Sequence, residues 1–273
     1  MRNNNPETIT SAKNPKIKEV TALQSSSSLR REKGLFVVEG RREVSRCIDA
    51  GYQVRTLFIC PEIAGEKVLR EMESLTDKTF HVSEPVYDRL AYRGGTEGIL
   101  AVIEAGSQPG LETLVLPADP LVVIVEAVEK PGNIGAMLRT ADAAGVDAFI
   151  ICDPHTDLYN PNLIRASLGG LFSTQVAVCN SEAAIPWLKK HGISILTAQL
   201  QDSELYYQTD MTRGIALVFG TEADGLSDLW RKASDARIRI PMLGRVDSLN
   251  VSASMAILCY EAVRQRHNTY AHE

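Results

Sequence analysis

Three short stretches in the second half of the chain combine glycines with polar side chains of the kinds that hold ligands. They are EKPGNIGAMLRTADAAG at 129–145, LVFGTEADGLS at 217–227 and IRIPMLGRVDSLNVSASMAI at 238–257. Each begins in, or directly after, apolar residues typical of a buried strand. Because ligands bind at the carboxyl ends of strands in open α/β sheets, we expect the three stretches to form one shared site.

The first stretch offers flexible backbone and two functional side chains. Gly132 and Gly135 would allow close backbone approach to a ligand. Asn133 is well placed to cap the following helix, and Arg139 would lie in its second turn. An arginine can bind a carboxylate or phosphate through two parallel hydrogen bonds, although a surface ion pair is the alternative for any single arginine. The stretch lacks both the GxGxxG dinucleotide pattern and a Walker loop, so it supports neither kind of nucleotide site.

The other two stretches place polar side chains in turns that lead into helices. Glu222 follows a strand that ends at Gly220, and it is either a functional carboxylate or a solvent-exposed turn residue. Ser248 and Asn250 flank Leu249 just before a helical pattern. Because Ser and Asn accept hydrogen bonds from the free N–H groups at a helix start, capping is the alternative explanation for both.

The composition excludes several classes of protein. The chain has 273 residues, of which 44% are hydrophobic and 23% charged, as in ordinary globular proteins. No apolar run approaches the roughly 18 residues of a membrane span, and the first residues lack the apolar core of a signal peptide. The five cysteines are scattered, with no CxxC or Cys/His spacing that suggests zinc. We therefore expect a cytoplasmic protein with reduced thiols, no metal and no membrane partner.

The net charge of −5 argues weakly against a nucleic-acid partner, but the charge is unevenly distributed. Residues 1–60 carry 11 Lys and Arg against 6 Asp and Glu, whereas residues 107–273 carry 13 against 19. A basic front end on an acidic body is compatible with a local phosphate-binding face. Random variation of surface charge is the alternative.

Apolar periodicity divides the chain into two α/β units joined by a linker. Residues 1–106 predict a small α/β domain, 107–119 a linker rich in Pro and Gly, and 120–273 a larger domain. In the small domain we expect strands at 35–40, 54–60, 79–83 and 98–104, a short helix after Asn14-Pro15 within 9–24, further helices at 41–51, 66–75 and 84–92, and a polar turn at 25–34.

In the larger domain, strands alternate with helices, which predicts a parallel sheet. The expected strands are 121–128, 147–152, 174–178, 194–199, 214–220 and 236–242. The expected helices are 133–145, 162–170, 182–192, 226–233 and 250–266.

Taken in order, the three stretches closely resemble the three signature motifs of the SpoU/TrmH branch of the SPOUT RNA methyltransferases. N-x-G-x-x-x-R-T-A-x-x-x-G starts at Asn133, F-G-x-E-x-x-G-L-S at Phe219 and I-P-M-x-G-x-x-x-S-L-N-V-S at Ile240. One departure is the second motif, T-E-A-D-G, where relatives often have N-E-G-x-G; Ala223 should be tolerated if only the backbone is used there. The front unit resembles, more weakly, the family's substrate-binding domain, which is related in fold to a small ribosomal protein; the matching pieces are NPKIKEVTAL, GLFVVEGRREV and TEGILAV.

The resemblance implies transfer of a methyl group from S-adenosylmethionine to a ribose 2′-oxygen of a structured RNA. It also implies a deep trefoil knot in a C-terminal SPOUT domain, and a site completed by the second subunit of a homodimer. The dedicated N-terminal domain favours ribosomal RNA over transfer RNA. Three other functions remain as alternatives: an inactive RNA-binding member, a base methyltransferase of another SPOUT branch, and an unrelated α/β oxidoreductase.

The resemblance assigns roles to single residues. Arg139 would orient the ribose and the adjacent phosphate, Asn133 would fix Arg139 or the ribose, and Glu222 would hold Asn133, the third motif or a basic partner. Ser248 and Asn250 would face the ribose and the methionine end of the cofactor. The expected cofactor-binding residues are Thr197, Ala198, Gly220, Ile240, Met242, Ser248 and Leu249. The expected RNA-contacting residues are Lys13, Lys16, Lys18, Arg30, Arg31, Lys33, Arg41 and Arg42.

Overall fold

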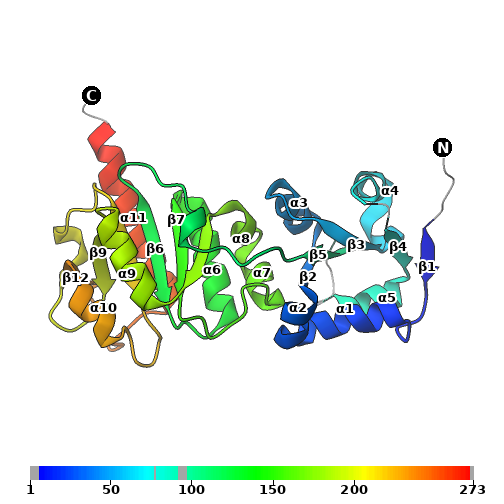
Figure 1. The fold of residues 1–273 in the computed structure, drawn as a ribbon, viewed down its shortest axis with the longest axis horizontal. Helices are drawn as coiled ribbons and strands as arrows, with labels where there is room; N and C mark the ends of the chain where they lie inside the picture. Colours follow the sequence, from blue (N-terminus) through cyan, green and yellow to red (C-terminus); the bar gives the residue numbers. More distant parts are fainter. Residues whose placement is uncertain (1–5, 77, 92–96, 271–273) are drawn as a thin grey trace. The chain divides into compact units, whose positions relative to one another are not determined.

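The computed structural model describes residues 6–76, 78–91 and 97–270 of the chain. Its contacts divide the molecule into two compact units (Figure 1). Unit 1 contains Met1–Ser107 together with Leu158–Gly169, and unit 2 contains Gln108–Asp157 and Gly170–Glu273. In the part of the chain that the structure describes, no helix is long and apolar enough to cross a membrane.

Unit 1 is built on a five-stranded sheet with the order β1-β4-β3-β5-β2. β5 pairs antiparallel with β2 and β3, whereas β4 pairs parallel with β3 and β1. One face of the sheet packs against α1 and α5 through Ile17, Leu23, Phe58 and Tyr87. The strands are β1 (Glu7–Ile9), β2 (Leu35–Glu39), β3 (Val54–Ile59), β4 (Thr79–Val82) and β5 (Ile99–Glu104), and the helices are α1 (Pro15–Ser25), α2 (Ser27–Lys33), α3 (Arg41–Asp49), α4 (Pro61–Glu73) and α5 (Glu84–Leu90).

The start of unit 1 differs from the sequence expectation in two places. The helix expected after Asn14-Pro15 is confirmed as α1, which begins at Pro15 because the Asn14 side chain caps it by accepting from the Lys16 N–H, but the strand β1 at residues 7–9 was not expected. The segment 25–34 is not a turn: it contains α2, capped by Ser26 and ended by Gly34 at φ 60°. Ser26, one of the serines that suggested a turn, is therefore a helix-capping residue. The last residue of the helix expected at 84–92 lies outside the described residues.

Residues 158–169 pack with unit 1, although the sequence division assigns them to the C-terminal domain. Their helix α7 (Pro161–Ser167) lies against β2, the edge strand of the sheet. Tyr159 stacks on Phe36 with ring centroids 4.2 Å apart, and its hydroxyl lies 3.3 Å from that of Tyr52. Arg46 donates to the Leu168 carbonyl at 3.1 Å. This segment supplies the apolar cover that the edge of unit 1 would otherwise lack.

Unit 2 contains a parallel seven-stranded sheet with the order β10-β12-β9-β11-β6-β7-β8. Its strands are β6 (Leu121–Glu126), β7 (Ala148–Cys152), β8 (Val176–Cys179), β9 (Ser194–Ala198), β10 (Glu204–Leu205), β11 (Ile215–Phe219) and β12 (Ala236–Arg239). Its helices are α6 (Pro131–Ala144), α8 (Gly170–Ser173), α9 (Ser181–Lys190), α10 (Asp228–Ala233) and α11 (Val251–Tyr270). The parallel C-terminal sheet predicted from the apolar strands is confirmed; the two-residue β10 was not predicted.

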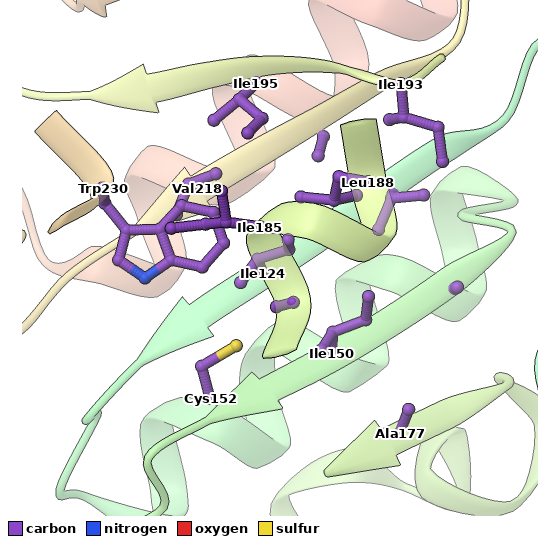
Figure 2. Packing of buried hydrophobic residues seen from close by; sticks show 14 of the residues in the cluster. Ile124, Ile150, Cys152, Ala177, Ile185, Leu188, Ile193, Ile195, Val218 and Trp230 are labelled. Carbon is purple, nitrogen blue, oxygen red and sulfur yellow. The ribbon is translucent and has the colours of Figure 1, made fainter. Parts of the chain in front are cut away.

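Helices cover both faces of the unit 2 sheet. On one face, Ile185 and Leu188 of α9 and Trp230 of α10 pack over Ile124 and neighbouring strand residues, as Figure 2 shows. Side chains alternate along a strand, so the intervening residues face the other side. There α11 packs against α6 and β11. The carboxyl ends of β6 and β11, which are adjacent strands, therefore lie beside the start of α6.

Two helix boundaries in unit 2 differ from expectation. α6 begins at Pro131 with Lys130 at the N-cap position, so Asn133 is not the cap and Arg139 falls in the third turn. Proline suits the first helical position because it lacks the N–H that would be unpaired there. The helix expected at 162–170 is split into α7 and α8, because Leu168 adopts a φ of 50° and Gly169 a φ of 88°.

We expect Tyr159→Ala to destabilise unit 1 by about 1–3 kcal/mol, because it removes an aromatic stack on Phe36. Tyr159→Phe, which keeps the ring, is the matched control and should cost about 1 kcal/mol or less. Hydrogen–deuterium exchange should show faster exchange in β2 and α3 for the alanine variant. Loss of protection confined to the strands of unit 2 would contradict the assignment of this segment to unit 1.

Candidate functional site

A cavity of 410 Å³ lies at the carboxyl ends of β9, β11 and β12. Its size falls within the roughly 300–1,000 Å³ typical of small-molecule sites. Four segments line it: Ala198, Gln199 and Leu200 after β9; Phe219, Gly220, Thr221, Glu222 and Gly225 after β11; Ile238, Arg239, Ile240 and Met242 at the end of β12; and Asp247, Ser248, Leu249, Asn250, Val251, Ser254 and Leu258 at the start of α11. The second and third motifs thus form most of its wall.

The cavity has apolar walls and a polar rim. Leu200, Ile240, Met242 and Leu249 provide aliphatic and thioether surface that suits a flat ring. Glu222, Ser248 and Asn250 provide hydrogen-bonding groups. This donor and acceptor set fits a ligand with an aromatic base at one end and charged or polar groups at the other.

Gly220 is required by the turn that forms one wall. Thr221 and Gly225 exchange two backbone hydrogen bonds, at 3.1 and 3.2 Å, which fold the second motif back on itself. A Cβ at Gly220 would lie 2.2 Å from the backbone carbonyl of Gly225. Gly132 differs, because a Cβ there would meet nothing within 4 Å. No neighbouring part of the chain therefore requires a glycine at position 132, and the close approach of a ligand expected there stays a prediction.

One carboxylate joins the first and third motifs to the second. Glu222 Oε1 accepts hydrogen bonds from Asn133 Nδ2 at 2.9 Å and from Asn250 Nδ2 at 2.8 Å. Its Oε2 accepts from the Nζ of Lys130. Asn250 Nδ2 also lies 3.3 Å from Asn133 Oδ1, so the two amides contact each other. The structure therefore brings together three of the five expected catalytic residues.

Asn250 also caps α11, while Ser248 does not. Asn250 Oδ1 accepts from the N–H of Ser252 at 3.1 Å and from its hydroxyl at 2.5 Å. Ser248 instead donates to the Asp247 carboxylate at 3.1 Å. The capping and site explanations are thus both correct for Asn250, whose amide nitrogen and oxygen serve different purposes.

The electrostatics of the network keep Glu222 ionised. The hydrogen bond from Lys130 is the main cause that lowers the pKa of Glu222, and burial, the next largest cause, opposes it. Hydrogen bonds from Asn133 and Asn250 lower the pKa further. Because both oxygens already accept hydrogen bonds and the pKa is low, Glu222 is a fixed acceptor at neutral pH and a poor general base.

Arg139 lies outside this network in a single chain. It is exposed on α6, does not line the cavity, and forms no hydrogen bond or ion pair with any described residue. Six residues separate it from Asn133, which at 3.6 residues per turn places the two side chains roughly 120° apart around the helix.

Most of the expected cofactor-binding residues line the cavity, and Thr197 is the exception. Ala198 is in the wall, but Thr197 is fully buried and its hydroxyl lies 2.9 Å from the Ser234 hydroxyl. Neighbouring residues in a strand point to opposite faces, so only one of the two can face the cavity. Leu200 lines the cavity and was missed. Lys130 was missed as a site residue, and the signal for it was its place in the first stretch, shortly before Asn133.

The basic residues expected to contact RNA divide into three groups. Arg30 is only 4% exposed and donates to the Leu23 carbonyl at 2.6 Å, so it holds α1 and α2 together and cannot face RNA. Lys16, Lys33, Arg41 and Arg42 form ion pairs with Glu7, Glu19, Glu71 and Glu43 respectively. Lys13, Lys18 and Arg31 are exposed and have no ion pair among the described residues. No cluster of three or more His, Cys, Asp or Glu that could hold a metal occurs in the described ranges.

Comparisons with known proteins define the class. The chain is similar over 95% of its length to a crystal structure described as an RNA 2′-O ribose methyltransferase, with 99% of that chain covered, 33% identity and a TM-score of 0.84. A second similar structure is the SpoU methyltransferase AviRb from Streptomyces viridochromogenes in complex with AdoMet. It is 28% identical to this chain with a TM-score of 0.84, and the match covers 93% of this chain and all of the other. These matches give the chain the two-domain fold of SpoU RNA methyltransferases.

The sequence comparisons agree with the structural ones. The chain is 30% identical over 264 residues to the 23S rRNA (uridine(2479)-2′-O)-methyltransferase of Streptomyces viridochromogenes, covering 93% of this chain and 91% of that protein. The model of the SpoU rRNA Methylase family matches residues 120–260, and the MRM3-like substrate binding domain matches residues 14–101. The chain belongs to the SpoU rRNA Methylase family, which confirms the resemblance seen in the three motifs.

We expect Gly220→Ala to weaken binding of S-adenosylmethionine by about tenfold or more, because the added methyl group displaces the wall at Gly225. Isothermal titration calorimetry measures the affinity, and a thermal melt checks the fold. Gly132→Ala is the matched control, since its methyl group meets open space. Equal affinities for the two variants would contradict the role of the Gly220 turn.

Proposed function

We propose that this protein transfers a methyl group from S-adenosylmethionine to the 2′-hydroxyl of a ribose in ribosomal RNA. The observation that carries the proposal is the network in which Glu222 joins Asn133 and Asn250 at the rim of the cavity. It unites all three family motifs beside a pocket of cofactor size. Related proteins named as 23S rRNA 2′-O-methyltransferases support the ribosomal substrate, and the expected cytoplasmic location follows from such a substrate.

The cavity is the proposed cofactor site. Ile240, Met242 and Leu249 would contact the adenosine, and the backbone around Gly220 would bind its polar edge. Ser248 would face the methionine end. When bound, the cofactor supplies an electrophilic methyl group on a sulfonium. The family's deep trefoil knot is part of this proposal: it is consistent with β12 pairing to β9 while α11 returns to pack on α6 and β11.

The chain's own residues must position the ribose and help its 2′-hydroxyl to lose a proton, because a neutral alcohol is a poor nucleophile. Asn133 and Asn250 are held by Glu222 in a geometry that can orient the ribose. Arg139 would bind the ribose and the neighbouring phosphate through its planar guanidinium. Holding reacting atoms in a near-attack arrangement can supply a large part of the rate enhancement.

A homodimer belongs to the proposal because a single chain leaves Arg139 exposed and outside its own cavity. A second copy would bring an Arg139 to the cavity rim. Arginine is always protonated at neutral pH, so its proposed role is orientation and charge stabilisation. The identity of the proton acceptor is not part of the proposal, and the low pKa of Glu222 argues against that residue.

Mapping ribose methylation in total RNA from a deletion strain and its parent tests the substrate. Nuclease digestion followed by mass spectrometry should show one 2′-O-methyl group lost from 23S rRNA in the deletion strain. A lost methyl group in transfer RNA, or on a base, would replace the proposal with the corresponding alternative. No loss in any RNA would favour an inactive RNA-binding protein.

We expect Arg139→Ala to lower the rate of methyl transfer by about two to three decades, by analogy with the loss of one preorganised charged donor. Affinity for S-adenosylmethionine should stay nearly unchanged, because Arg139 does not line the cavity. Arg139→Lys should fail nearly as badly, since an ammonium lacks the planar fork. Near-normal single-turnover rates for Arg139→Ala would show that Arg139 is not the central residue.

Mixing two inactive variants tests the dimer. In a heterodimer of Arg139→Ala and Asn250→Ala chains, one of the two sites would be complete if each site takes Arg139 from the partner. Mixing should then restore part of the activity, once subunit exchange has been verified with differently labelled chains. Full exchange without any recovery would contradict a site shared between two subunits.

We expect the exposed cations Lys13, Lys18 and Arg31 of unit 1 to contribute to RNA binding. Changing all three to Gln should weaken binding and reduce the slope of log K against log salt by roughly 2–3, because each phosphate contact contributes roughly 0.7–0.9. A triple Gln variant at Lys189, Lys190 and Lys232, exposed lysines of unit 2, is the control. Equal slopes for both variants, measured by filter binding, would contradict an RNA face at these residues.

A further inference from the structure

Lys130 stands at an unfavourable place for a cation. It occupies the N-cap position of α6, where the helix dipole is positive and where acidic or neutral residues are normally stabilising. Its side chain makes no capping hydrogen bond and is 69% exposed. The charge is offset by Glu222, which lies 92 residues later in the chain and whose carboxylate binds the Lys130 ammonium. This long-range pair requires an explanation beyond helix formation.

The pair determines how Glu222 is presented to the two asparagines. Lys130 takes Oε2, which leaves Oε1 to accept from both Asn133 and Asn250. A carboxylate held at one oxygen cannot rotate freely about its terminal bond. Without Lys130, Oε2 would lose its partner, and the two amides alone would orient the carboxylate through Oε1. Asn250 would keep its capping bond to Ser252, but the acceptor on its other side would be less firmly held and more easily protonated.

The orientation of the amides matters because each asparagine has one donor and one acceptor end. With both Nδ2 groups directed at Glu222, the Oδ1 atom of Asn250 serves α11 and the Oδ1 atom of Asn133 lies at the junction of the motifs. If an amide rotated by half a turn, its NH2 donor and its carbonyl acceptor would change places, and the substrate would meet the opposite hydrogen-bonding group. The Lys130 side chain acts on this choice through Glu222; the backbone carbonyl of Lys130 accepts from the Asn133 N–H at 3.0 Å, a bond that side-chain substitutions leave in place.

Other charged groups near the Lys130–Glu222 pair lie farther away or interact with other residues. The interaction with Lys130 is the main cause that lowers the pKa of Glu222, and no other charged group contributes to that shift. Glu129, which contacts His155 at 4.0 Å, also raises the pKa of Lys130. Further charged groups nearby are Asp224, in the same turn as Glu222, Arg231, whose guanidinium lies beside Gly225, and Asp247 and Arg239, which line the cavity.

We propose that Lys130 is a positioning residue for methyl transfer, which holds Glu222 ionised and oriented so that the asparagines of the first and third motifs keep one fixed arrangement. The proposal deepens the proposed function and rests on it for the step that is assisted. Its structural part, the control of Glu222 by Lys130, stands without cofactor or RNA.

The structural part is tested in the protein without ligands. Carbon-13 NMR of glutamate carboxyl groups, with the Glu222 signal assigned through Glu222→Gln, gives the pKa of this group. Lys130→Met should raise the pKa of Glu222 toward its ordinary value, and Lys130→Arg should leave it low. Lys189→Met, which removes an exposed lysine of α9 that has no ion pair among the described residues, is the control and should change nothing. An unchanged pKa of Glu222 in Lys130→Met would overturn the proposal.

Methyl transfer tests the functional part. Lys130→Met should reduce kcat by about twofold to fivefold near neutral pH, the range expected for a largely exposed ion pair. The loss should grow as the pH falls toward 5, because a carboxylate whose pKa has risen becomes protonated at a higher pH. Lys130→Arg should restore both the rate and the acid limb of the pH profile.

The outcomes separate the possible explanations. A loss that appears only in KM for RNA, fades in high salt and leaves the acid limb unmoved would make Lys130 a phosphate contact and overturn the positioning role. A normal rate and pH profile for Lys130→Met would overturn it as well. If the native protein methylates no RNA, the proposed function fails, while the NMR titration still decides whether Lys130 controls Glu222.

Discussion

The hydrogen bonds that Glu222 accepts from Asn133 and Asn250 are the interaction on which the site depends. Asn133 lies 89 residues before this carboxylate and Asn250 lies 28 residues after it, so the chain must fold completely before they meet. Three features bring them together: β11 and β6 are neighbours, α6 starts at Pro131, and α11 packs against α6. The buried parallel sheet thus acts as the frame that keeps three loops in register at one edge.

Much of this frame could be predicted from the sequence. Continuous apolar runs such as 121–125 and 215–219 predicted buried parallel strands, and glycine with polar residues after each run predicted a shared site. The errors in the predicted helices arose from local capping, which decides where a helix begins. Asn133 matched a helix cap, but Pro131 begins the helix earlier; serines at 25–28 matched a turn, but Ser26 caps α2. Thr197 and Arg30 show a further limit, because only the folded structure shows which side of a strand or helix is buried.

The distribution of charged residues along the sequence predicted less about the RNA-contacting face than their positions in the folded structure do. The basic excess of residues 1–60 suggested a continuous cationic face, but several of those residues are balanced by nearby carboxylates, including Glu71 from outside the segment. Exposed ion pairs contribute little to stability and exchange readily for other partners. Such residues can still respond to a polyanion, but the unpaired cations can bind phosphate without first losing a partner. Counting residues by type cannot make this distinction, because it depends on contacts between α1 and α2 and between α3 and α4.

The chain passes between its two units three times, because residues 158–169 leave unit 2, pack against β2 and return. A protease that cuts the 107–119 linker would therefore leave the halves joined by two intact peptide connections. Unit 1 carries a helix encoded within the span matched by the methylase family model, so its gene segment cannot be exchanged at a single boundary. In this protein, the substrate-binding and methyltransferase regions are interleaved modules, which would be transplanted only together with the helix that they share.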